Sequence, residues 1–528
     1  MTDIQLTDEL SPAERRALLT DLLRTNRARP RVLPLAPAQQ RLWFLDRLVP
    51  GHSVYNIPMA MWLSGPLDCA SFERALSEVA RRHEALRTTF SQRDGEPMQV
   101  VAPDGAVYVA VVDLTAFPED QREGEALRLA NEEARRPFDL EQGPLLRVSL
   151  LDLGDNRRLS VLVMHHIVSE AWSVSLLLEE VSRLYQAFVN GLPSPLPELP
   201  LQYGDFANWQ RNRAAGAGVQ PDLDYWRRQL AGAPPFIEIP TDRPRPAMRS
   251  YRGAWKTLQL AQSTTEALHA FSRREGVTPF MSLLAAYGIL LHRYSGAPEV
   301  VVGAPVAGRN RPETEKLIGF FVNTLALRID LAGAPTFREL VARVRETCVG
   351  AFEHQDVPFE RLVEELQPNR TLSHSPIFQV MFALQNAPPP VLRLPGIVAE
   401  APVSAAQVHN GGAKADLSFF ITEAAGELSA AFEYASDLFD GDTIAQMLES
   451  FRELLDGALA EPDRQIDGLS LLTEEQRHRV LVEWNETATA FPRDRSIPEL
   501  FEAQAARTPD AQAVRFGDDA VTYRELDE

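Results

Sequence analysis

A proline-rich stretch over residues 191–249 has little hydrophobic periodicity and separates two halves of similar size. Connections inside a compact unit usually run to about 4–6 residues, so a stretch of this length indicates a junction between two lobes. On both sides of it, helical patterns alternate with short apolar runs. The sequence therefore predicts a mixed α/β (α+β) protein with one lobe over 33–205, a connection over 206–249 and a second lobe over 250–461.

The hydrophobic periodicity also predicts individual elements in both lobes. In the first lobe we expect a helix over 72–87, a buried strand over 158–164 and a helix over 174–188. In the second lobe we expect helices over 280–294, 337–352 and 445–460, and strands over 299–303 and 325–329.

The two ends of the chain are predicted to lie outside these lobes. Ser11, Pro12 and Glu14 form a helix-start signal followed by a leucine stripe, so residues 1–30 should hold an amphipathic helix, a candidate docking segment. Residues 471–528 contain a helical pattern and two short strands that cannot close a core alone. We therefore expect a linker and the start of a further domain there.

Charge and cysteine content exclude several classes of protein. The chain has 53 Lys and Arg residues against 73 Asp and Glu, a net charge of −20, which repels nucleic acids and anionic lipids. Cys69 and Cys348 lack the spacing of a disulfide framework or a thiolate zinc site. No apolar run is long enough for a membrane span, and the acidic N-terminus is unlike a signal peptide. We expect a soluble, cytoplasmic protein with no nucleic-acid or membrane partner.

The segment richest in chemistry is 164–172, where an apolar strand ends in His165 and His166. Neighbouring strand residues point to opposite faces, so one imidazole can face a cleft while the other anchors the turn. Ser169 is the expected cap of the following helix, and Glu170 can order the site. A histidine that titrates near neutral pH can move a proton from an attacking amine to a leaving group, as acyl transfer requires. A structural histidine pair at a strand end remains the alternative.

Other chemistries leave sequence marks that this chain lacks. It has no GxSxG, GxGxxG, P-loop or HExxH motif, and no second acid and histidine cluster at metal-ligand spacing. It also lacks the Gly-Gly-x-Ser context of a serine that carries phosphopantetheine. Any carrier must therefore belong to another domain, and metal and nucleotide chemistry are disfavoured.

Seven segments, in order, resemble the motifs of nonribosomal peptide synthetase condensation domains, which are related in fold to chloramphenicol acetyltransferase. The resemblance extends from about Leu33 to Glu461. Its segments are LAPAQQRLWFL (35–45), RHEALRTTF (82–90), MHHIVSEAWS (164–173), YGDFANW (203–209), IGFFVNTLALR (318–328), HQDVPFE (354–360) and NRTLSHSPIFQVMF (369–382). One such segment is a weak signal, whereas seven in order are specific.

The resemblance implies two acetyltransferase-like lobes in a V-shaped pseudo-dimer with a central tunnel. Two carrier proteins would thread their phosphopantetheine arms toward His166, and the acceptor's amine would attack the donor's thioester. His166 would act as a base or as a positioning group, and His165 would be structural. No bound cofactor, ATP or metal is implied, because the thioester already carries the energy.

The family's HHxxxDG motif ends here in Glu170 and Ala171. In the family the aspartate holds the turn through an arginine, for which Arg309 is our preferred partner and Arg82 the alternative. Alanine still supplies an N–H but not the conformational freedom of glycine. The substitutions allow either a retuned enzyme or one with weakened or lost activity. A noncatalytic platform that recruits carriers, or an epimerase or other acyltransferase on the same fold, therefore stays open.

Several further residues fall in or near the motifs. Asn323, Gln355 and Ser375 are candidates for the tunnel wall or for a bridge between lobes, although such polar residues often satisfy backbone groups. Trp172 is expected in the core rather than as a substrate platform. A set of arginines in the connection could bind a carrier or form a solvated loop: Arg243, Arg245, Arg249 and Arg252.

The tail from Ser496, ending in VTYRELDE, resembles the start of an adenylation domain. That order fits an elongation module with its own acceptor carrier. Because the chain starts at its own Met without a preceding carrier, we expect the donor carrier to come from an upstream subunit. The residues of the first two motifs resemble those of the subclass that joins an L-configured donor to an L-configured acceptor.

Overall fold

The computed structural model describes residues 30–366, 372–385, 390–424, 426–490 and 492–528. The predicted N-terminal helix within residues 1–30 lies outside the described residues, apart from residue 30. The chain divides into two compact units, one ending at Leu471 and one running from Leu472 to Glu528. The two lobes predicted from the sequence both belong to the first unit.

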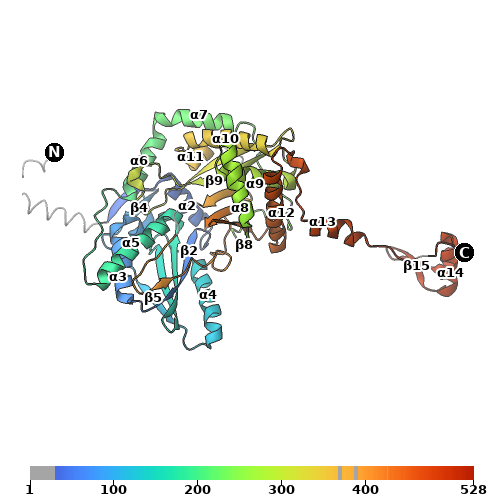
Figure 1. Cartoon of the computed structure of the whole chain (residues 1–528), viewed down its shortest axis with the longest axis horizontal. Helices are drawn as coiled ribbons and strands as arrows, with labels where there is room; N and C mark the ends of the chain where they lie inside the picture. The colour runs from blue at the N-terminus through green and yellow to red at the C-terminus, as the bar shows by residue number, and fades with distance from the viewer. Residues whose placement is uncertain (1–29, 367–371, 386–389, 425, 491) are drawn as a thin grey trace, which may run out of the picture. The chain divides into compact units, whose positions relative to one another are not determined.

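The first lobe is built on a five-stranded sheet of order β12-β2-β7-β6-β5 (Figure 1). Its strands are β2 Asn56–Ser64, β5 Val109–Asp113, β6 Leu146–Gly154, β7 Arg157–His165 and β12 Val398–Ala399. Helices α3 Cys69–Arg82 and α5 Ala171–Val189 pack on one face, and α4 Glu119–Arg135 packs on the other. Both faces of β7 are therefore covered, which explains the apolar run over 161–164 in its second half.

A smaller three-stranded sheet completes the first lobe, in the order β1-β4-β3. Its strands are β1 Arg31–Pro34, β3 Thr88–Arg93 and β4 Glu96–Val101. Helix α2 Pro37–Leu48 follows β1 directly, and Pro37 stands at its first position, where the missing N–H costs nothing.

The second lobe contains a six-stranded sheet of order β10-β9-β11-β13-β14-β8. Its strands are β8 Gly253–Gln259, β9 Glu299–Val306, β10 Asn323–Asp330, β11 Val380–Gln385, β13 Leu417–Ala424 and β14 Glu427–Ala435. Its helices are α8 Gln262–Glu275, α9 Pro279–Ser295, α10 Phe337–Glu353, α11 Phe359–Leu366 and α12 Gly441–Ala460. Helix α9 is buried almost throughout, so the second lobe has its own core.

The connection differs from the sequence prediction because it contains two helices, α6 Tyr203–Ala215 and α7 Gln220–Gln229. Each is anchored by a buried aromatic residue, and in α7 this residue belongs to a buried apolar stripe of Val219, Leu223, Trp226 and Leu230. The Tyr203 hydroxyl donates to the carbonyl of Phe320 at 2.8 Å, and the Trp226 indole N–H donates to the carbonyl of His354 at 3.0 Å.

The second half of the chain also contributes a strand to the first-lobe sheet. The short strand β12 comes from the second half of the sequence but pairs antiparallel with β2, with Val398 opposite Ser64 and Ala399 opposite Leu63. The first-lobe sheet is therefore completed by the second half of the chain.

The remaining predicted elements are present with small shifts in their ends. The predicted helix over 72–87 ends as α3 at Arg82 and continues as a 3₁₀ turn over Glu84–Arg87. The C-terminal unit contains α13 Glu474–Leu481, α14 Ile497–Arg507, the antiparallel pair β15 Gln512–Phe516 and β16 Asp519–Thr522, and α15 Tyr523–Asp527.

Candidate active site

The two histidines occupy different environments at the end of β7. His165 is the last residue of the strand and is 3% exposed. Its Nδ1 accepts a hydrogen bond from the Ile167 N–H at 3.2 Å. Burial lowers the pKa of His165 to about 3, so the side chain is neutral and holds the turn.

His166 begins a 3₁₀ turn that ends at Val168, and its side chain is partly exposed. The backbone N–H of His166 donates to the carbonyl of Tyr55 at 2.8 Å. Its ring makes an edge contact with Phe320, with 5.2 Å between ring centroids. The Nδ1 atom is buried and makes no hydrogen bond within the described chain. Burial, and next the positive charge of Lys414, hold the pKa of His166 well below its usual value, so His166 is neutral.

Glu170 is 2% exposed, and both of its carboxylate oxygens accept hydrogen bonds. Its Oε1 accepts from the Arg309 Nε at 2.7 Å. Its Oε2 accepts from the backbone N–H groups of Phe321 at 3.1 Å and Val322 at 2.9 Å. Burial nevertheless raises the pKa of Glu170 to about 6. The preferred partner in the sequence analysis, Arg309, is thus the residue that Glu170 contacts.

Arg309 ties Glu170 to the segment 314–319. Its guanidinium also donates to the carbonyls of Thr314 and Leu317 and to the Ser173 hydroxyl, the latter at 3.0 Å. Ser173 Oγ in turn donates to the carbonyl of Gly319 at 3.0 Å. The guanidinium lies 4.1 Å from the centroid of the Phe321 ring. The charge pair therefore joins helix α5 to a second-lobe segment.

The same segment comes close to His166 because Gly319 allows a tight approach. A Cβ atom at Gly319 would lie 2.0 Å from Cδ2 of Tyr203, so a larger residue cannot be accommodated there. Tyr203 holds the next carbonyl, that of Phe320, whose ring lies against His166. Three separate sequence motifs meet at this point.

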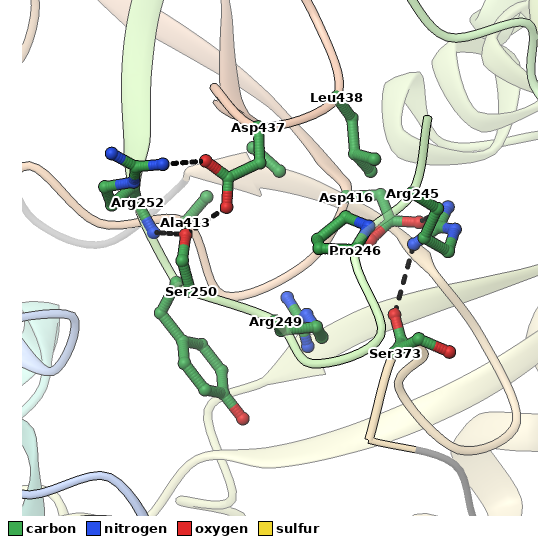
Figure 2. Close-up of a pocket in the computed structure, with 12 residues that line it drawn as sticks. Arg245, Pro246, Arg249, Ser250, Arg252, Ser373, Ala413, Asp416, Asp437 and Leu438 are labelled. Atoms are coloured by element: carbon green, nitrogen blue, oxygen red, sulfur yellow. Dashed lines mark hydrogen bonds and ion pairs between the residues drawn. The ribbon is translucent and has the colours of Figure 1, made fainter. Parts of the chain in front are cut away.

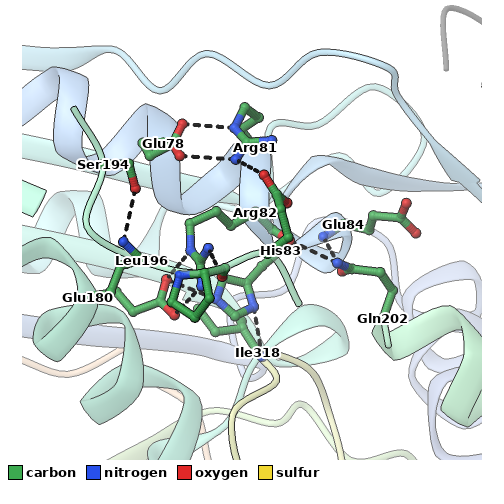
Figure 3. A network of polar contacts seen from close by, with 12 residues as sticks. Glu78, Arg81, Arg82, His83, Glu84, Glu180, Ser194, Leu196, Gln202 and Ile318 are labelled. Atoms are coloured by element: carbon green, nitrogen blue, oxygen red, sulfur yellow. Dashed lines mark hydrogen bonds and ion pairs between the residues drawn. The ribbon is translucent and has the colours of Figure 1, made fainter. Parts of the chain in front are cut away.

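Arg82, the alternative partner of Glu170, pairs with Glu180 instead (Figure 3). Its Nε and Nη2 donate to the two oxygens of Glu180 at 3.0 and 3.1 Å. His83 Nε2 lies 3.1 Å from the same carboxylate, and His83 Nδ1 accepts the N–H of Ile318 at 3.2 Å. Although burial opposes it, the bonds from His83 and Arg82 hold the pKa of Glu180 below its usual value. This cluster therefore supports the segment from the other side.

One expectation about the helix start is wrong. The N-cap of α5 is Glu170 rather than Ser169, because the 3₁₀ turn occupies residues 166–168 and leaves Ser169 in an extended conformation. The Ser169 hydroxyl is buried without a hydrogen-bond partner in the described chain. Ala171 is exposed and is the first residue of α5, where the backbone is helical. That conformation does not require glycine.

The tunnel candidates form structural contacts. The Asn323 amide donates to the carbonyls of Gln355 and Val357 at 2.8 and 2.7 Å and accepts from the Phe359 N–H at 3.0 Å. Gln355 donates to the carbonyl of Phe352. Asn323 and Gln355 are therefore brought together, and both satisfy backbone groups. The Trp172 indole donates to the carbonyl of Glu315 at 3.0 Å, but its side chain is only partly buried.

The arginines of the connection are bound to the second lobe (Figure 2). Arg245 pairs with Asp416 at 2.6 Å and Arg252 pairs with Asp437 at 2.6 Å. Arg243 contacts Asp440 in the same way. Arg249 donates to the Ser375 hydroxyl at 2.6 Å, which places Ser375 in a structural contact. Each of these arginines therefore has a partner in the second lobe, although the side chains of Arg243 and Arg252 stay 47% and 74% exposed.

Sequence reasoning missed the cation with the largest effect on His166, which is Lys414. It lies in the stretch just before β13, outside the seven motifs. One signal was available: only three of the 53 Lys and Arg residues are Lys. Within the described residues, no group of three His, Cys, Asp or Glu side chains could hold a metal ion. None of the described helices is long and apolar enough to cross a membrane.

A fold of two acetyltransferase-like lobes with a neutral histidine at their junction defines a class of acyltransferases. The family model described as "Condensation domain" matches residues 30–481. The chain belongs to the condensation domains of nonribosomal peptide synthetases, and its two lobes form their chloramphenicol acetyltransferase-like pseudo-dimer.

The curated relatives are long synthetases of which this chain spans a minor part. One protein of the linear gramicidin synthase of Brevibacillus parabrevis is 46% identical over 499 residues, which are 94% of this chain and 6% of that protein. The phosphinothricin tripeptide synthetase PhsB of Streptomyces viridochromogenes is 43% identical over 499 residues, which are 93% of this chain and 42% of that protein.

Solved structures give the same result. The X-domain from teicoplanin biosynthesis is 29% identical with a TM-score of 0.75, covering 84% of this chain and 98% of that one. The first condensation domain of the calcium-dependent antibiotic synthetase, in complex with a substrate analogue, is 25% identical with a TM-score of 0.71 and covers 84% of this chain and 100% of that one.

Proposed function

We propose that this condensation domain forms amide bonds by moving an aminoacyl or peptidyl group from a donor thioester to the amine of an acceptor thioester. The amine nitrogen forms a C–N bond with the donor carbonyl carbon, and the C–S bond breaks. The amine's proton leaves with the sulfur, so a thiol is the second product. Both substrates are carried on the phosphopantetheine arms of separate carrier proteins.

The observation that carries this proposal is a neutral, partly exposed His166 whose turn is held by the Glu170–Arg309 pair. A neutral imidazole has a free lone pair that can accept a hydrogen bond from the acceptor amine. Because burial and neighbouring charge disfavour the imidazolium, we infer that His166 orients the amine and passes its proton on without accumulating as a cation.

The Glu170–Arg309 pair supports retained activity despite the departure from the family motif. Glutamate reaches the arginine that the sequence analysis names, and its second oxygen binds two backbone N–H groups. A broken ion pair at this position would favour the hypothesis of a noncatalytic platform. The pair is intact, which favours the catalytic hypothesis.

We further propose the place of this domain in its assembly. The C-terminal unit resembles the start of an adenylation domain, which fits an elongation module with its own acceptor carrier and a donor carrier from an upstream subunit. The residues of the first two motifs fit the subclass that joins an L-configured donor to an L-configured acceptor. We propose one lobe over 33–205, a connection over 206–249 and a second lobe over 250–461. A linker and the start of a further domain would occupy 471–528.

The test mixes this chain with a donor carrier and an acceptor carrier, each loaded chemically with an aminoacyl phosphopantetheine, and follows both carriers by intact mass. We expect the donor carrier to lose its acyl group and the acceptor carrier to gain it as a dipeptide. Hydrolysis of the donor without gain on the acceptor, or no change with the folded protein, would overturn the proposal.

A further inference from the structure

The segment 410–414 of the second lobe is fastened to the first lobe beside His166. The Asn410 amide donates to the carbonyls of Val54 at 3.1 Å and Asn56 at 2.9 Å, and its oxygen accepts from the Gly412 N–H at 2.9 Å. Asn410 is 7% exposed, so these bonds are shielded from water. One buried amide therefore fixes a second-lobe turn against two first-lobe carbonyls.

Gly412 brings the two backbones into direct contact. A Cβ atom at Gly412 would lie 2.7 Å from the Cα of Val54. The next residue along from Val54 is Tyr55, whose carbonyl accepts the backbone N–H of His166. The turn that carries Lys414, two residues after Gly412, is thus built against the strand start that holds His166.

The backbone of Lys414 is fixed on both sides. Its N–H donates to Glu433 Oε1 at 3.0 Å, and its carbonyl accepts from Arg249 Nη2 at 2.9 Å. Glu433 is 2% exposed and also accepts from the Ser418 hydroxyl. In contrast, the Lys414 ammonium forms no salt bridge or hydrogen bond with the residues that the structure describes, and the side chain is partly exposed.

A lysine is well suited to such a place. It is a compact point charge, whereas arginine presents a planar fork that favours bidentate partners. Besides each other, the charged and titratable groups that act on His166 and Lys414 are Arg41, His165 and Glu433, and Arg249 acts in turn on Glu433. The effects of Lys414, His165 and Arg41 on His166 all disfavour its protonation.

We propose that Lys414 supplies the positive charge that stabilises the oxyanion formed when the acceptor amine attacks the donor thioester. This inference rests on the proposed function. Negative charge develops on the thioester carbonyl oxygen as the C–N bond forms and disappears when the C–S bond breaks, so the ammonium neither gains nor loses a proton. A positive charge held beside the oxygen on which negative charge develops is effective in this role.

The positive charge of Lys414 affects two protonation equilibria. It disfavours the imidazolium form of His166, and it disfavours the ammonium form of an acceptor amine bound beside it. The amine must be neutral to attack. Glu433 has the complementary role: burial lowers the pKa of Lys414, and the Glu433 carboxylate opposes this shift and so favours the ammonium form.

The test compares the full chain with Lys414→Met, Lys414→Arg and Glu433→Gln, with the exposed Lys316→Met as a matched control. The Lys414 backbone bonds do not need its side chain, so the variants should fold, and thermal unfolding checks this. NMR titration of the histidines provides a readout independent of activity. In Lys414→Met the pKa of His166 should rise toward its usual value of 6.5, and in Lys414→Arg and Lys316→Met it should stay depressed.

Single-turnover transfer between loaded carriers, measured against pH, gives the second readout. Lys414→Met should slow transfer by about 100-fold, the scale for loss of one oxyanion-stabilising group, and move the acid limb to higher pH. Lys414→Arg should restore most of the rate, and Glu433→Gln should move the basic limb to lower pH.

The outcomes separate the two hypotheses. If the parent transfers no acyl group, the proposed function fails, while the His166 titration still tests whether Lys414 acts on this site. If the parent is active but Lys414→Met matches it in rate and pH profile, the role of Lys414 is overturned. Equal losses in Lys414→Met and Lys414→Arg with an unchanged His166 titration would likewise overturn it, because they indicate a structural role.

Discussion

The two sides of His166 differ in how their polar groups are satisfied. On the Glu170 side, both carboxylate oxygens and all three nitrogens of Arg309 have partners, and the pair is almost fully buried. On the Lys414 side, the ammonium has no bonded partner within the described residues, and His166 Nδ1 also lacks one there.

This difference distinguishes residues that hold the fold from residues that can act on the substrate. Buried polar groups in a folded protein are almost always paired, so a fully paired network serves to fix geometry. Groups left unpaired next to a partly exposed histidine retain their capacity to bind a substrate. We infer that the Glu170 side holds the turn and that the Lys414 side faces the reaction.

The largest expected effect is on the scaffold side. Glu170→Ala leaves Arg309 buried without its carboxylate, and we expect the free energy of unfolding to fall by about 3–5 kcal/mol. Chemical denaturation measures this. The matched control is Glu132→Ala, which removes an exposed partner of Arg128 and should change the unfolding free energy far less. Equal effects of the two substitutions would remove the distinction that we draw.

A second prediction concerns the pH dependence of stability through His165. Its folded-state pKa of about 3 lies below the ordinary 6.5, so the unfolded chain binds more protons here between those values. The contribution of His165 is therefore fully present above pH 6.5 and is lost as the pH falls toward 3, by up to about 1.4 kcal/mol per pH unit.

His165→Asn tests this dependence because asparagine Oδ1 can accept the Ile167 N–H in place of Nδ1. Between pH 6.5 and 5, we expect the parent to lose about 2 kcal/mol more unfolding free energy than the variant. Denaturation curves at several pH values give the two slopes. Parallel slopes would show that His165 is not held neutral.

The smallest expected effect is on the transfer rate when the two departures from the family motif, Glu170 and Ala171, are reverted. Combining Glu170→Asp with Ala171→Gly should leave the transfer rate within about twofold of the parent, since the parent turn is already held and a misplaced group costs far more than this. Stopped-flow or quench measurements with loaded carriers provide the rate, with Ala171→Gly alone as the control. A rise of about tenfold or more in the double variant would mean that Glu170 displaces the catalytic turn.

Much of the fold could be predicted because its signals are local. The apolar run before His165 predicts a strand covered on both faces, and the periodic helices of both lobes are present. The helices of the connection were missed because they are short and lie in a proline-rich stretch. In α7 the periodic signal consists of only four apolar residues, Val219, Leu223, Trp226 and Leu230, which is little to recognise from the sequence.

The site was only partly predictable for a related reason. Arg309 could be named as a partner of Glu170 because the family resemblance implies an arginine partner for the acidic residue at this position. Lys414 and Asn410 act on residues more than 200 positions away along the sequence, and nothing in their own surroundings indicates those partners. The position of Ser169 also depended on a 3₁₀ turn that sequence spacing does not reveal.

The central claim is that His166 takes part in the reaction and not in holding the fold. Its Nδ1 makes no hydrogen bond in the described chain, so His166→Ala should leave the unfolding midpoint close to that of the parent. Single-turnover transfer between loaded carriers, followed by intact mass, should slow by about 100-fold or more, the scale for a positioned proton acceptor. Transfer at the parent rate by folded His166→Ala protein would contradict the account.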